Sequence, residues 1–102
     1  MNLGMIKQAM ELKSRLEKAQ KELAKMKVEA ESGKGTVKAT ANGRQKILSI
    51  EISPEVINPD KAAQLEKMVL EAVTKALDES KKLADKHLGK LTNGIKIPGI
   101  ID

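Results

Sequence analysis

Apolar residues in the N-terminal quarter of the chain recur at helical spacing. Within residues 3–27 they are separated by alternating intervals of four and three residues, at Met5, Ala9, Leu12, Leu16, Ala19, Leu23 and Met26. A period of about 3.5 residues is typical of a helix that lies along another helix. No glycine or proline interrupts the pattern after Gly4. The spacing therefore predicts one long helix over residues 3–27.

The chain then changes from a helical to an alternating pattern. Alternating apolar and polar residues occupy 28–32, 36–41 and 47–52. In the third stretch, Leu48, Ile50 and Ile52 are expected to point inward. The intervening Gly33-Lys34-Gly35 and Asn42-Gly43 are typical of hairpin turns, because glycine and asparagine tolerate positive φ. We predict a three-stranded antiparallel meander with one apolar face.

A second helical pattern follows the strands. Asn58 is placed to cap a helix, Pro59 to occupy its first position, and Asp60 to meet the positive end of its dipole. Residues 59–92 then carry one broad apolar face, formed by Leu65, Met68, Val69, Ala72, Val73, Ala76, Leu77, Leu83, Ala84, Leu88 and Leu91. Asn93-Gly94 is typical of a helix end. The second predicted helix is therefore longer than the first.

The predicted order is α-β-β-β-α, an α+β fold in a single domain over residues 1–94. An apolar tail over residues 95–102 is expected to be flexible or docked. At about 1.5 Å per residue the helices would span about 37 and 50 Å, whereas a compact domain of about 100 residues has a radius of gyration near 13 Å. At least one helix must project, with its apolar seam in water. We expect a second copy to bury that seam, in a homodimer with projecting helices.

The composition narrows the possible classes of protein. The 102 residues include no Phe, Tyr, Trp or Cys and one His. An aliphatic core in so short a chain is marginal, which also favours oligomerisation. Zero cysteines exclude thiolate zinc sites, redox chemistry and disulfides. Because no apolar run approaches the roughly 18 residues of a membrane span and no signal core is present, we expect a cytoplasmic protein without a membrane partner.

Basic residues outnumber acidic residues, by 19 to 14. Seven basic and three acidic residues fall within 1–28, so most of the excess belongs to the first helix. An exposed lysine is commonly just a solvated surface residue, but a basic stripe also suits a polyanion. The candidate DNA-binding residues are Lys7, Lys13, Arg15, Lys18, Lys21 and Lys25 on the first helix, and Lys81, Lys82, Lys86 and Lys90 near the end of the second. Lysine contacts phosphate as a point charge, and no aromatic ring is available to stack on an unpaired base. The pattern favours double-stranded DNA bound by its backbone, with low sequence preference.

The sequence contains no pattern typical of catalysis. The segment from Gly33 to Thr36 lacks the spacing of a phosphate-binding loop and leads into a strand, so we interpret it as a hairpin turn. His87 lies one turn from Leu83 and Leu91 and is expected to sit at the boundary of an apolar face. No nucleophile–base set and no metal-ligand spacing occurs. We expect no enzyme activity, no cofactor, no metal and no small-molecule substrate.

Several stretches of the chain form a recognisable set: Lys7 to Met10, Val28 to Gly33, Gly35 to Gly43, Ile50 to Glu55, and a terminal Gly-x-x-x-Pro-Gly at Gly94 to Gly99. Together they resemble the YbaB/EbfC family of bacterial nucleoid-associated DNA-binding proteins. The resemblance covers nearly the whole chain. It implies an α-β3-α homodimer, described as tweezer-like, that binds duplex DNA in the cytoplasm, at the nucleoid, through its projecting helices.

Two other functions fit parts of the pattern. A coiled-coil scaffold or holdase chaperone would bind protein clients through the apolar helix faces, with exposed methionines supplying adaptable contacts. An amphipathic helix on anionic lipid is weaker, because the first helix has no aromatic residue and many alanines. Protection of an aggregating client without retardation of DNA would indicate the first alternative, and co-sedimentation with liposomes the second.

Overall fold

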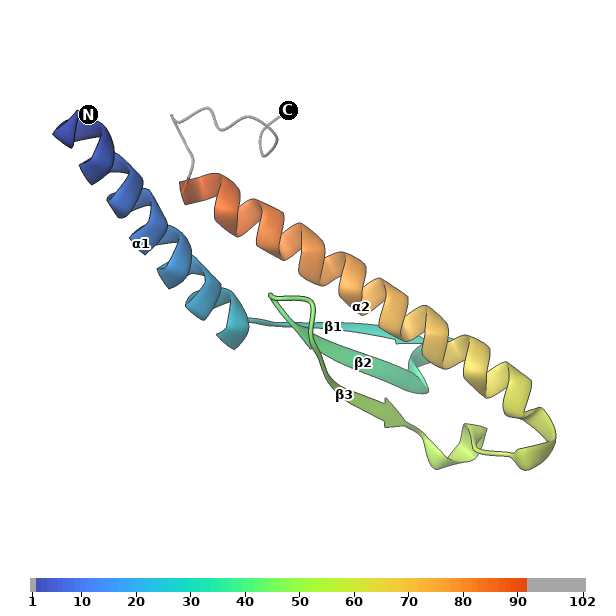
Figure 1. Cartoon of the computed structure of the whole chain (residues 1–102). Coiled ribbons are helices and arrows are strands. Elements are labelled where there is room, and N and C mark those ends of the chain that lie inside the picture. Colours follow the sequence, from blue (N-terminus) through green and yellow to red (C-terminus); the bar gives the residue numbers. More distant parts are fainter. Residues whose placement is uncertain (1, 92–102) are drawn as a thin grey trace.

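Two long helices and a small antiparallel sheet make up the computed structural model, which describes residues 2–91 (Figure 1). The order is α1 (Leu3–Lys25), β1 (Lys27–Ser32), β2 (Val37–Asn42), β3 (Ile47–Ile52) and α2 (Ala62–Leu91). This confirms the predicted α-β-β-β-α order and the α+β class. The predicted tail over residues 95–102 lies outside the described residues.

The molecule is elongated, as the predicted helix lengths require. Its principal extents are 67 × 24 × 18 Å and its radius of gyration is 19.0 Å, well above the roughly 13 Å of a compact domain of this length. In Figure 1, α2 lies along the sheet and continues past it, whereas α1 leaves the sheet and extends away from the body.

The N-terminal helix α1 is capped at both ends. The side-chain oxygen of Asn2 accepts a hydrogen bond from the Gly4 N–H at 2.9 Å. At the other end, the N–H groups of Met26 and Gly43 donate to the carbonyl of Leu23 at 3.2 and 2.8 Å. The helix therefore ends at Lys25, two residues earlier than predicted, because Met26 is already extended and leads into β1.

The sheet has the order β1-β2-β3, with both pairs antiparallel. The first turn, Gly33–Gly35, joins β1 to β2 as predicted, and Gly33, Lys34 and Gly35 all have positive φ. A Cβ on Gly33 would collide with the side chains of Met68 and Thr36. Because a positive φ and a close contact coincide at Gly33, we expect only glycine to fit there without strain.

The core lies between the sheet and the first half of α2. Its fully buried residues are Val37, Ala39, Ala41, Ala72 and Ala76. The alanines on both sides allow the α2 backbone to approach the sheet closely. Partly buried apolar residues surround them, and all but Ala30 are larger: Val28, Ala30, Ile47, Ile52, Leu65, Met68, Val69 and Val73. A core without aromatic residues is therefore built from small side chains in the middle and larger ones around them.

The prediction for β3 is partly wrong. Ile52 packs against the core, but Leu48 and Ile50 are 43% and 44% exposed. A register shift opposite Thr40 and Ala41 leaves Leu48 as the extra residue of a bulge, so that Ile47 takes the inward place. Ile50 is on the correct face, opposite the buried Ala39. It remains exposed because α2 packs mainly over β1 and β2.

The second hairpin turn joins α1, the sheet and α2. We call Asn42, Gly43 and Ser80, which are all buried, the α1 junction. The Ser80 hydroxyl donates to the Asn42 carbonyl and accepts from the Gln45 N–H at 2.9 Å. The Asn42 side-chain oxygen accepts from the N–H groups of Arg44 and Lys46 at 2.9 and 3.1 Å. These bonds hold the turn against α2.

The expected reason for Asn42-Gly43 was positive φ, and that reason is wrong. In this turn the positive φ falls on Gln45, at 62°. Glycine is needed at position 43 for close approach, because a Cβ there would lie 2.7 Å from the Leu23 carbonyl oxygen and 2.9 Å from its Cδ2. The junction thereby determines the position at which α1 leaves the body.

The second helix begins as predicted, with one difference in its first turn. The Asn58 side-chain oxygen accepts from the Asp60 N–H at 3.0 Å, and Pro59 takes the first helical position. Pro59–Lys61 form a 3-10 turn, and the α-helix proper runs over Ala62–Leu91.

Candidate nucleic-acid interface

One side of α1 is buried and the opposite side carries lysines. Ala19 and Leu23 are each 1% exposed. Successive residues of a helix are rotated by about 100°, so four exposed lysines lie on the far side from Ala19 and Leu23. We call this set the lysine face: Lys7, Lys18, Lys21 and Lys25. Within residues 2–91, none of the four forms an ion pair with an acidic side chain. Their charge is therefore directed to solvent.

Two other predicted residues of α1 lie on its flanks. The same rotation places Lys13 and Arg15 on opposite sides of the lysine face, each about a quarter turn or more away from it. Both are exposed. Arg15 lines a shallow pocket with Met5 and Leu12, which puts its side chain toward the apolar side of the helix. The structure therefore brings four of the six predicted α1 residues into one row.

The predicted lysines of α2 divide into a row and an outlier. Lys82, Lys86 and Lys90 are exposed and follow one another at intervals of four residues along one side of the helix. Lys82 Nζ lies 3.5 Å from a Glu79 carboxylate oxygen, so this acidic side chain partly neutralises its charge. Lys81 is rotated by about 100° from Lys82, and the structure does not place it in the row.

The two helices meet through other side chains. His87 Nε2 of α2 lies 3.3 Å from a carboxylate oxygen of Glu22 on α1. His87 is 19% exposed in its side chain, which agrees with the predicted boundary position. Leu23 of α1 and Leu88 of α2 line one pocket between the helices. The lysine face lies on the far side of α1 from Leu23, while Glu22 lies beside its Lys18 edge. The helix pair therefore has its apolar side chains inside and its α1 lysines outside.

A second basic position was missed from the sequence. Arg44, at the tip of the β2–β3 hairpin, lines the same pocket as Lys81. We call Arg44 and Lys81 the basic corner. One carboxylate, that of Asp85, lines the same pocket. The two residues are far apart in sequence, and the hydrogen bonds of the α1 junction bring them together. Only the position of Arg44 in an Asn-Gly turn signals its exposure from the sequence.

Comparison with known proteins identifies the family. A model of the YbaB/EbfC DNA-binding family matches residues 1–95. The chain belongs to the YbaB/EbfC DNA-binding family. This confirms the resemblance seen in the hairpin and helix stretches.

Named relatives of this YbaB/EbfC chain carry one description. A nucleoid-associated protein of Thermoanaerobacter pseudethanolicus is 44% identical over 97 residues, covering 95% of this chain and 87% of that protein. A nucleoid-associated protein of Pelotomaculum thermopropionicum is 40% identical over 96 residues, covering 94% of this chain and 91% of that protein. The crystal structure of an uncharacterized protein from Helicobacter pylori matches with a TM-score of 0.63 at 16% identity, over 80% of this chain and 94% of that one. The structural match concerns the fold.

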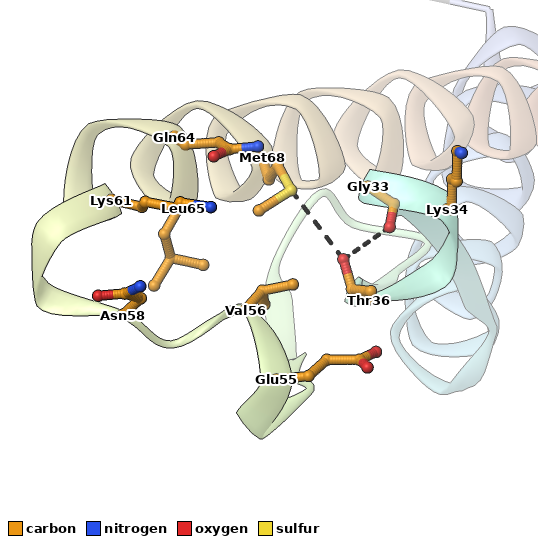
Figure 2. Close-up of a pocket in the computed structure, with 10 residues that line it drawn as sticks. All are labelled: Gly33, Lys34, Thr36, Glu55, Val56, Asn58, Lys61, Gln64, Leu65 and Met68. Atoms are coloured by element: carbon orange, nitrogen blue, oxygen red, sulfur yellow. Dashed lines mark hydrogen bonds between the residues drawn. The ribbon is translucent and has the colours of Figure 1, made fainter.

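A pocket of about 340 Å³ lies beside the first hairpin turn, between it and the start of α2 (Figure 2). Figure 2 shows Val56, Leu65 and Met68 turned toward the cavity. The Thr36 hydroxyl donates to the Gly33 carbonyl at 2.7 Å, so this hydrogen bond stabilises the hairpin turn. Lys34, Lys61 and Glu55 also line the pocket. The side chains that line it offer no nucleophile–base pair.

The ninety described residues, 2–91, contain neither a membrane-spanning helix nor a metal-binding cluster. None of their helices carries an apolar stretch long enough to span a membrane. Nor do any three of their His, Asp or Glu side chains lie close enough together to hold a metal ion.

Proposed function

We propose that this chain is a non-enzymatic, nucleoid-associated protein of the bacterial cytoplasm that binds duplex DNA as a homodimer. The lysine face carries the proposal: four exposed lysines lie in one row on a helix that extends from the body. Membership in a DNA-binding family and the names of the relatives support it. Lys13, Arg15, the α2 row and the basic corner would add positive potential around that row.

The chemistry of these residues favours phosphate over bases. Lys18 and Lys25 are about 10 Å apart along α1, which suits neighbouring phosphates on a duplex. A lysine ammonium contacts phosphate as a point charge, whereas bidentate reading of guanine requires arginine. The chain has no aromatic ring to stack on an unpaired base. We therefore expect backbone contacts and low sequence specificity.

We assign the second copy to β3. Leu48 and Ile50 on β3 are exposed, and Ile57 just after it is 58% exposed; we call these three residues the β3 surface. β3 is also an edge strand, so one side of its backbone has no partner strand within residues 2–91. An exposed edge with apolar side chains tends to pair with another chain. A second copy would cover this surface and double the number of lysine faces.

A salt titration tests the DNA interface. Removing one lysine–phosphate interaction should flatten the slope of log affinity against log salt by about 0.9. We expect the triple variant Lys18→Gln, Lys21→Gln, Lys25→Gln to weaken retardation of random duplex DNA and to flatten this slope. The matched control is Lys61→Gln, Lys67→Gln, Lys75→Gln, which removes the same charge from the turn before α2 and from the first half of α2. Equal slopes for the two triple variants would contradict the proposed interface.

Sedimentation velocity at micromolar concentration tests the homodimer. The Ile50→Asp variant should sediment as a monomer, because it places a charge in the proposed contact, while its partly exposed position preserves the fold. Ser49→Asp adds the same charge on the other face of β3 and should remain a dimer. If the wild-type protein is a folded monomer, the homodimer is wrong. If both variants are dimers, the contact lies elsewhere, with the α1 seam as the alternative.

A scaffold or holdase is the second candidate function. The N-terminal half of α1 favours it, because Leu3, Met5 and Met10 are between 65% and 75% exposed. Suppression of the aggregation of a heat-denatured client, without retardation of duplex DNA, would support this function and contradict DNA binding.

A further inference from the structure

The apolar seam of α1 continues beyond the part that the fold buries. Ala19 and Leu23 are covered, but the same line of residues runs on toward the N-terminus as Leu16, Leu12, Ala9 and Met5, which we call the α1 stripe. Exposure rises along it: Leu16 and Leu12 are half-buried, Ala9 is exposed, and Met5 is 67% exposed. A shallow pocket of about 520 Å³ runs along this part of the helix, with Met5, Ala9 and Leu12 on one side and Gln8, Glu11 and Arg15 on the other. The stripe is the apolar side of this hollow.

The stripe becomes exposed where α2 ends. The contact between His87 and Glu22 places the last turns of α2 beside the C-terminal part of α1. The described part of α2 ends at Leu91, about one turn later. In Figure 1, α2 runs toward the N-terminal end of α1, and α1 extends past the end of α2. The described part of α2 therefore ends near the Leu16 end of the stripe, with its axis directed along the stripe.

The segment that follows has the composition needed to cover this surface. Four of the seven residues from position 95 to 101 are isoleucines: Ile95, Ile97, Ile100 and Ile101. Pro98 has no backbone N–H and disfavours a helix through this segment. Six extended residues reach about 20 Å, whereas Leu16 and Ala9 are only about 10 Å apart along α1. The segment is long enough to lie along the stripe of its own chain.

We infer that residues 95–101 pack on the α1 stripe of the same chain. The burial of isoleucine against leucine, alanine and methionine removes two apolar surfaces from water at once. The lysine face lies on the opposite side of α1, so the docked segment leaves it open to DNA. The β3 surface is on the sheet, so it also stays available to a second copy. The α1 stripe is thus a surface that neither DNA binding nor dimerisation uses.

Disulfide formation in the full chain tests the inference, because the native sequence has no cysteine. One double variant combines Ile97→Cys with Ala9→Cys, on the stripe. The matched control combines Ile97→Cys with Ser14→Cys, which lies on the lysine side of α1 at a shorter distance from Leu91 along the helix. Under mild oxidation we expect the Ala9→Cys pair to form an intrachain disulfide at least ten times faster than the Ser14→Cys pair. Non-reducing gels separate intrachain from interchain products.

Two results would overturn the inference. Equal rates for the two pairs would mean that the segment has no preferred side of α1. A mainly interchain product with Ala9→Cys would mean that a second copy covers the stripe. Amide hydrogen exchange gives a separate measurement in cysteine-free protein: Ile95→Ser with Ile97→Ser should raise exchange over residues 5–16 several-fold and leave β2 unchanged. Unchanged exchange over residues 5–16 would contradict the docked segment even if the cysteine variants failed to fold.

Discussion

The two ends of α1 share one sequence pattern but have opposite surroundings. Leu23 and Met5 occupy equivalent positions of the same apolar seam, yet Leu23 is 1% exposed and Met5 is 67% exposed. Near Leu23 the helix is closed in by the β2–β3 hairpin and by α2, and its last carbonyls are capped by backbone N–H groups. Near Met5 no described element lies over the seam. Periodicity thus defines which side of a helix is apolar, whereas the rest of the fold decides where along the helix that side is buried.

Truncation of the two seam residues should show the largest difference. Leu23→Ala leaves a cavity at the α1 junction and should lower the free energy of unfolding by about 2–5 kcal/mol. Met5→Ala removes an exposed side chain and should cost less than about 1 kcal/mol. Urea denaturation at fixed protein concentration measures both values. Similar losses in the free energy of unfolding at the two positions would mean that the N-terminal half of α1 is as well covered as its C-terminal half.

Two glycines extend the same comparison from side chains to the backbone. Gly43→Ala places a Cβ against the carbonyl and side chain of Leu23, and we expect a loss of about 1–3 kcal/mol from overpacking. Gly89, in the projecting part of α2, has no atom within 4 Å of an added Cβ. Gly89→Ala should therefore raise stability by about 0.5–1 kcal/mol through better helix propensity.

Thermal and urea unfolding of the two alanine variants measure these opposite changes. A Gly43→Ala protein as stable as the wild type would show that α1 can shift at its base without cost, and that the junction does not determine its position. A destabilised Gly89→Ala protein would show that another part of the assembly lies against that side of α2.

The elements that the sequence predicted well are those whose burial depends on one helix face or one strand face. The α1 seam, the inward alanines of β2 and the apolar face of α2 against the sheet follow from local period alone. β3 was mispredicted because its burial depends on how far α2 extends over the sheet and on a bulge at Leu48. Neither the extent of α2 over the sheet nor the bulge can be predicted from the alternation of apolar and polar residues over 47–52.

The same distinction applies to the candidate interface. The row formed by Lys7, Lys18, Lys21 and Lys25 could be predicted, because helical geometry alone aligns it. The basic corner could not, since Arg44 and Lys81 meet only through the hydrogen bonds between Ser80 and the β2–β3 turn. Residues 29–58 carry no net charge. Their contribution to the basic surface, through Arg44, can be seen only in the folded chain.

Removal of the Ser80 hydroxyl should have a moderate effect at the buried end of α1. Ser80→Ala removes the hydroxyl that bonds both the Gln45 N–H and the Asn42 carbonyl, which then keep only the longer hydrogen bond to each other at 3.3 Å. We expect a loss of about 1–2 kcal/mol in the free energy of unfolding, together with faster amide exchange at Gln45. Ser14→Ala, on the exposed side of α1, is the matched control and should change stability by less than about 0.5 kcal/mol. Equal stability of the two variants would mean that water replaces the Ser80 hydroxyl at no cost.

The smallest effect is expected where Glu22, in the last turn of α1, meets His87 of α2. The Glu22 side chain is 45% exposed, so solvent screens the contact, and Glu22→Gln should lower stability by no more than about 0.5 kcal/mol. Its local effect should be clearer, as faster amide exchange in the last turns of α2 that rest on this contact. Glu17→Gln removes the same charge from an exposed position of α1 and should leave α2 unaffected. A double-mutant cycle with His87→Gln isolates the pair, and a coupling well above about 0.5 kcal/mol would mean that solvent screens this contact less than the exposure of the Glu22 side chain indicates.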